Sequence, residues 1–104
     1  MAFKIRCEFW RLSTTNDGIA TVMLDQALSD AIEIAAATSS PVTLPTLNGN
    51  TYAMSVEGLT GTAVVEVAKT PTQSQARGRR INKDGLHWFK VSPGSKIYVQ
   101  EYSA

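Results

Sequence analysis

Apolar and polar residues alternate along most of this chain. In the first segment, residues 3–12, one side of an extended backbone carries the apolar side chains of Phe3, Ile5, Cys7 and Phe9. The same period of two recurs in residues 52–56, 62–69, 86–91 and 96–102, and a further strand is predicted over residues 19–24. Alternation of this kind predicts β-strands with one face buried and one face polar.

Residues that favour turns separate these segments. They are Asn48-Gly49, Gly58 to Gly61, Asp84-Gly85 and Ser92-Pro93-Gly94. Residues 42–44 lie between two prolines and predict a short strand at a sheet edge, where a missing N–H is tolerated. The pattern predicts an all-β fold, an antiparallel β-sandwich or jelly roll of about 7–8 strands.

Residues 25–36 fit two readings. Leu28, Ala31, Ile32 and Ala35 follow helical spacing, whereas Ile32 to Ala36 alternates as a strand would. Because propensity is a weak guide inside a β-rich chain, a short helix and a strand both stay open here.

The stretch from residue 70 to 83 has no apolar periodicity. Structureless segments of this length are uncommon in small domains unless they are functional or mobile. We therefore predict a single β-sandwich domain over residues 1–104 with an extended loop at about 70–83. We also expect Thr70 to Arg80 to be mobile in the free protein and to order on a partner.

Charge is distributed unevenly along the chain. Residues 1–68 hold three basic and seven acidic residues, whereas residues 69–104 hold seven basic and two acidic ones. This asymmetry suits head-to-tail contact between subunits or contact with an anionic partner, unless interleaved strands mix the two halves. The single cysteine, Cys7, excludes an intrachain disulfide. No signal peptide or membrane span is predicted.

The residues carry no recognisable catalytic, metal or cofactor motif. His87 is the one histidine and lies inside a predicted strand, where a structural role is the better interpretation. Histidine-based metal sites cannot form within one chain, and we expect no cofactor and no enzymatic activity. Gly58 to Gly61 is better explained as a turn than as a phosphate-binding loop.

Two groups of residues are candidates for an interaction surface. The first is the basic cluster of Arg77, Arg79, Arg80 and Lys83. Arginine binds carboxylate and phosphate through paired N–H donors, although a solvated loop tip explains the cluster equally well. Near-neutral net charge and the absence of an aromatic residue inside the cluster argue against nucleic-acid binding.

The second group is aromatic. Phe9-Trp10 and Trp88-Phe89 are adjacent pairs, so alternation sends each phenylalanine toward the core and each tryptophan to the outer face. Tyr98 and Tyr102 likewise lie opposite Ile97 and Val99. Exposed tryptophan and tyrosine are enriched in protein interfaces, although covering by a loop or by long basic side chains is an equal alternative.

The second half of the chain resembles the small β-sandwich modules of bacteriophage head and tail proteins. The resemblance spans roughly residues 52–102 and lies in Gly58 to Val67, a long insertion, Asp84 to Val91 and the ending Lys96 to Val99. It implies a virion structural protein without enzymatic activity, such as a capsid decoration or head-associated assembly protein. Implied partners are other virion or capsid subunits, in a homo-oligomer or lattice, after synthesis in the host cytoplasm without a signal peptide. The alternative is a carbohydrate- or ligand-binding β-sandwich module with aromatic stacking platforms.

Overall fold

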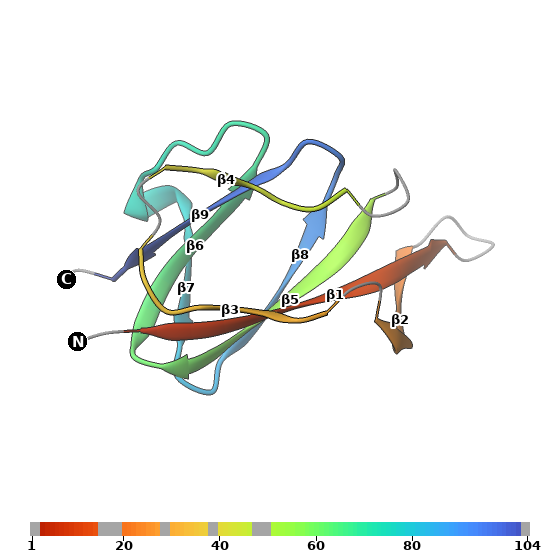
Figure 1. The fold of residues 1–104 in the computed structure, drawn as a ribbon, viewed down its shortest axis with the longest axis horizontal. Helices are drawn as coiled ribbons and strands as arrows, with labels where there is room; N and C mark the ends of the chain where they lie inside the picture. The colour runs from red at the N-terminus through yellow and green to blue at the C-terminus, as the bar shows by residue number, and fades with distance from the viewer. Residues whose placement is uncertain (1–2, 15–19, 28–29, 38–39, 47–50, 103–104) are drawn as a thin grey trace.

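The computed structural model describes residues 3–14, 20–27, 30–37, 40–46 and 51–102. Within these ranges the chain forms nine strands and one short 3-10 helix, Gln75–Arg77 (Figure 1). The strands are β1 (Lys4–Thr14), β2 (Ala20–Ala27), β3 (Ile32–Ile34), β4 (Val42–Thr43), β5 (Tyr52–Thr60), β6 (Thr62–Ala68), β7 (Arg79–Asn82), β8 (Leu86–Val91) and β9 (Lys96–Glu101).

The strands form two antiparallel sheets. The first sheet has the order β2-β1-β5-β8, with β3 also paired to β1, and the second has the order β4-β9-β6-β7. In Figure 1, β6 and β9 lie in the upper left of the view and the β1–β5 pair runs below them and to the right. The predicted all-β, sandwich-like fold is confirmed, and β4 lies at a sheet edge as the flanking prolines predicted.

Residues 25–36, for which the sequence allowed a helix or a strand, are extended in the part that the structure describes. Residues 25–27 belong to β2, and Ile32–Ile34 forms β3. β3 pairs with Ile5 to Cys7 of β1 on the side of β1 opposite β5. The helix alternative is therefore wrong here, because the hydrogen-bonding edge of a long neighbouring strand outweighs local helical spacing.

The core lies between the two sheets. Its largest fully buried side chains are Tyr52, Phe9, Ile5, Met54, Ile97, Val56, Val65, Val91, Val99 and Cys7. Phe9 and Tyr52 meet edge to face, with ring centroids 5.8 Å apart, and the Tyr52 hydroxyl donates to the Pro45 carbonyl at 2.7 Å. Phe89 faces the core as predicted but is only half-buried, because β8 is an edge strand.

One end of the sandwich is closed by a contact at Gly58. The sequence predicted a turn from Gly58 to Gly61, but β5 runs through to Thr60 and only Gly61, with φ 62°, separates it from β6. Gly58 stays in the strand and hydrogen-bonds to the turn between β7 and β8, donating to the Gly85 carbonyl at 2.9 Å. A Cβ at Gly58 would collide with the backbone carbonyl of Asn82, so this close approach of the two sheets requires glycine.

The predicted extended loop at about 70–83 is divided by the structure. It contains the 3-10 helix Gln75–Arg77 and the strand β7, which pairs with β6. Its first part is attached to the buried carboxylate of Glu66, which accepts hydrogen bonds from Thr72 N (2.9 Å), Thr72 Oγ1 (3.0 Å) and Gln73 N (3.0 Å). We call residues 69–78 the β6–β7 connection. A loop interpretation fails for β7 because pairing with β6 needs no apolar periodicity in so short a strand.

Candidate functional site

Two tryptophans meet on the outer face of the first sheet. Trp10 on β1 is level with Ala53 of β5, and Trp88 on β8 is level with Ser55 of the same strand. Their ring centroids lie 6.4 Å apart, with the planes inclined by 58°. The structure therefore brings together two residues that the sequence predicted only to share the outer side of the sheet.

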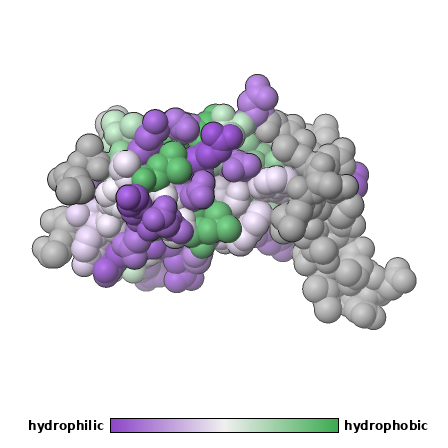
Figure 2. Space-filling model, turned by 90° about the horizontal axis from the view of Figure 1, so that it is seen from below, coloured by the Kyte–Doolittle hydropathy of each residue, from purple (hydrophilic) through white to green (hydrophobic). Residues whose placement is uncertain are grey.

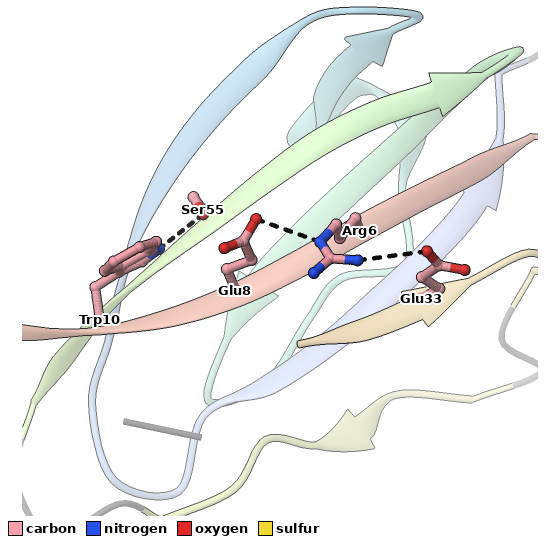
Figure 3. A network of polar contacts seen from close by, with 5 residues as sticks. All are labelled: Arg6, Glu8, Trp10, Glu33 and Ser55. Carbon is pink, nitrogen blue, oxygen red and sulfur yellow. Dashed lines mark hydrogen bonds and ion pairs between the residues drawn. The ribbon is translucent and has the colours of Figure 1, made fainter. Parts of the chain in front are cut away.

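Small residues of β5 make this pairing possible. Ala53 and Ser55 lie on the outer face between the two tryptophans and are nevertheless buried, at 4% and 5% exposure. The Trp10 indole N–H donates to Ser55 Oγ at 3.0 Å (Figure 3). This bond satisfies the polar tip of Trp10 and holds its ring against the sheet.

Leu86 extends the aromatic surface along β8. It lies two residues before Trp88, hence on the same side of the strand, and is 58% exposed, while Trp88 is 41% exposed. We define the tryptophan patch as Trp10, Leu86 and Trp88. Leu86 was not among the residues singled out from sequence, although its alternation with Trp88 was the signal that could have identified it.

Charged side chains of both signs lie beside the tryptophan patch. Arg6 Nε contacts Glu8 Oε1 at 3.3 Å, and Arg6 Nη1 contacts Glu33 Oε2 at 3.6 Å (Figure 3). Lys4 Nζ lies 3.1 Å from Glu33 Oε1. These side chains are 35% to 44% exposed, so each pair contributes little to stability, and their main effect is on the electrostatic character of this face.

The other predicted interface residues lie elsewhere. Tyr98 and Tyr102 alternate with the inward-facing residues of β9, and the Arg80 guanidinium lies 4.1 Å from the centroid of the Tyr102 ring. Arg80 and Tyr102 line an open depression of about 490 Å³ on the second sheet, together with Gln75, Ala76 and Gly78. The candidates identified from sequence therefore do not form one continuous surface.

The remaining basic residues are also separated from the tryptophan patch. Arg77 and Arg79 line a second cleft, beside β6, and exposed Lys83 lies in the turn between β7 and β8. Figure 2 shows one face of the molecule as mainly hydrophilic, with separate hydrophobic areas. The basic residues are adjacent in the chain and were predicted to form one cluster, but β7 sends Arg79 and Arg80 to opposite faces of the second sheet.

The single cysteine and the single histidine of the chain lie on β1 and β8 of the first sheet. Burial raises the pKa of the Cys7 thiol to about 12, so the sulfur stays protonated and a poor nucleophile at neutral pH. His87 is half-buried, with its ring centroid 4.9 Å from that of Phe89. Among the residues that the structure describes, no three His, Cys, Asp or Glu side chains come close enough together to hold a metal ion.

In the described ranges, no helix has the length and apolar character needed to cross a membrane. A scan against protein-family models found no match, and searches of curated proteins and of solved structures found no similar chain.

Proposed function

We propose that this chain is a non-enzymatic assembly protein that associates with other subunits through the tryptophan patch. The proposal rests on the contact between Trp88, which is 41% exposed, and Trp10, whose indole N–H donates to Ser55 on the neighbouring strand β5. Tryptophan on a pre-organised surface is the residue type that most often dominates binding energy in protein interfaces.

We assign a second copy of the chain, or a similar subunit, as the partner. The patch is bordered by Arg6 and Glu8 on β1 and by Lys90 on β8, so both signs of charge flank an apolar centre. A surface of mixed sign can face its own copy across a two-fold axis without like charges meeting. A virion structural role, as a capsid decoration or head-associated protein, is supported by the sequence resemblance described above.

A carbohydrate-binding module is the second candidate, and the ring geometry separates it from the first. A sugar ring stacks best on a flat aromatic surface, whereas the planes of Trp10 and Trp88 are inclined by 58°. Only the exposed ring of Trp88 remains for stacking, which favours the protein interface.

Sedimentation velocity over a range of concentrations tests the proposal. The unmodified chain should self-associate, and Trp88→Ala should weaken association by about tenfold or more, as interface anchors do. The matched control is Val42→Ser, which removes an apolar side chain that is 50% exposed on the second sheet.

Equal weakening by the Val42→Ser control would show non-specific hydrophobic association and contradict the proposal. A chain that stays monomeric at every concentration and binds immobilised glycans would support the carbohydrate module instead.

A further inference from the structure

The second sheet has a gap along one side of β6. β6 pairs with β9 over residues 63–68 but with β7 only over residues 62–65. In the part of the chain that the structure describes, Glu66 to Ala68 therefore have a neighbouring strand on one side only. Backbone N–H and C=O groups at such an edge are available to an added segment.

A cleft of about 420 Å³ lies at this gap. Its apolar lining comes from Val65 and Val67 of β6 and from Phe89, which reaches it from the first sheet. Val67 and Phe89 are only half-buried and pack against the core, so the cleft exposes part of the apolar interior. This volume accommodates one apolar side chain with its backbone.

Two arginines give the cleft its charge. Arg77 and Arg79 both line it, and within the described residues neither forms an ion pair with a carboxylate. Glu66 also lines the cleft, but both of its oxygens already accept hydrogen bonds from Thr72 and Gln73. The two guanidinium groups are suited to binding one further carboxylate.

The path of the chain limits what can enter the gap. The β6–β7 connection leaves β6 after Ala68 and returns at Arg79, which is level with Val65. Both ends of the gap are therefore bounded by the protein's own backbone. A peptide that passed through the gap would have to leave it past this backbone, whereas a peptide that ends inside the gap would not.

We propose that this cleft binds the C-terminal residue of another polypeptide. The apolar side chain of that residue packs against Val67 and Phe89, its carboxylate binds Arg77 and Arg79, and its backbone pairs with the free edge of β6. A fatty acid has the same carboxylate and apolar tail but makes no use of the β6 edge, so we assign the ligand to a peptide. This cleft is separate from the tryptophan patch, and the proposal stands independently of self-association.

A pair of fluorescent peptides provides the probe. Both have the sequence Gly-Ser-Thr-Val-Leu with a fluorophore at the N-terminus, one ending in a free carboxylate and the other in an amide. In fluorescence anisotropy titrations of the full chain, we expect the amide to bind about tenfold more weakly or worse, because a charge-assisted pair is lost. Methyl NMR signals of Val65 and Val67 should shift with the free-acid peptide.

Two neighbouring arginines supply matched variants. Arg79→Glu should lower the affinity for the free-acid peptide by about tenfold or more. Arg80→Glu should change that affinity by less than about twofold, because Arg80 lies on the opposite face against Tyr102. Both variants change net charge equally and replace exposed side chains. Thermal melts of each variant check that the fold is retained.

Three results would overturn the proposal. Equal affinity for the acid and the amide would show that no terminal carboxylate is bound. Equal weakening by Arg79→Glu and Arg80→Glu would show non-specific charge attraction. Saturable binding of decanoate without binding of the free-acid peptide would assign the cleft to small apolar carboxylates.

Discussion

The outer faces of the two sheets carry the same alternation but are covered differently. On the first sheet the outward side chains Trp10 and Trp88 are themselves the outermost layer, and Trp88 stays 41% exposed. On the second sheet the outward side chains Val64 and Glu66 are buried, at 2% and 8% exposure. The β6–β7 connection accounts for this difference, since Gly78 lies against Val64 and Thr72 is bonded to Glu66.

The side of the sheet on which a side chain lies and the exposure of that side chain are two separate properties. Period-two patterning assigns a side chain to one side of a sheet, but exposure depends on whether another segment covers that side. Covered outer residues contribute to stability as core residues do, whereas uncovered aromatic residues remain available to a partner.

The largest expected effect contrasts the two sides of the first sheet. Phe9→Ala should lower the free energy of unfolding by ~3–5 kcal/mol, because it removes a ring that is 1% exposed in the core. Trp10→Ala should cost about 1–2 kcal/mol, since Trp10 is half-buried and loses one hydrogen bond and one ring contact. Urea denaturation of both variants measures the difference. Equal losses would mean that the outer side of β1 is as enclosed as the inner side.

The stability of the protein at alkaline pH reports on the core that lies between the two sheets. Burial raises the pKa of Cys7 to about 12 and that of Tyr52 to about 12. Between the ordinary pKa and the raised one, the unfolded chain loses its proton while the folded chain keeps it, so stability falls as pH rises. The decline should begin near pH 9 for Cys7 and near pH 10 for Tyr52, at up to about 1.4 kcal/mol per pH unit for each group.

Thermal melts from pH 7 to 11 measure this decline. Cys7→Ala serves as the control, because it should remove the part of the pH dependence that starts near pH 9 while lowering stability at pH 7 by the lost packing. An unchanged pH profile in Cys7→Ala would contradict the assignment of that part to the thiol.

Two adjacent valines test whether the outer side of the second sheet is truly covered. Val64 and Val65 point to opposite sides of β6 and are 2% and 0% exposed. We expect Val64→Ala and Val65→Ala to cost similar amounts, about 2 kcal/mol each, because both lose buried apolar volume. Denaturant titrations provide the measurement. A Val64→Ala variant as stable as the unmodified chain would show that the β6–β7 connection does not pack on β6.

The smallest effect concerns two outward-facing glutamates, one on each sheet. Glu66→Ala removes the acceptor of three hydrogen bonds and should cost about 1–2 kcal/mol, whereas Glu57→Ala, on the exposed outer side of β5, should cost less than about 0.5 kcal/mol. Limited trypsin digestion gives a second readout, since loss of the Glu66 contacts should speed cleavage at Arg77.

The same digestion tests the expectation that Thr70 to Arg80 is mobile in the free protein. Cleavage at Arg77, Arg79 and Arg80 in the unmodified chain would support mobility, whereas a segment that trypsin spares at all three arginines is packed and would contradict it. Equal cleavage rates in the unmodified chain and the Glu66→Ala variant would show that the carboxylate does not restrain the connection.

The sequence by itself determined strands such as β1 and β8 and the two sides of each. Phe3, Ile5, Cys7 and Phe9 alternate with polar neighbours, and all four are buried. β8 spans Leu86–Val91 as predicted, with its tryptophan outward and Phe89 inward. These features follow from the two-residue period of an extended backbone, which needs no knowledge of the partner strand.

Only the tertiary structure decided which outer residues meet and which are covered. Trp10 lies 45 positions from Ser55 along the chain, and no local pattern places its indole N–H over that hydroxyl. Burial of Glu66 likewise depends on a connection without apolar periodicity, and β3 became a strand because β1 offered it an edge. The tryptophan contact and β3 depend on pairing between segments far apart in the chain, whereas the Glu66 contacts depend on the path of the connection that follows β6. Local propensity is too weak to specify either.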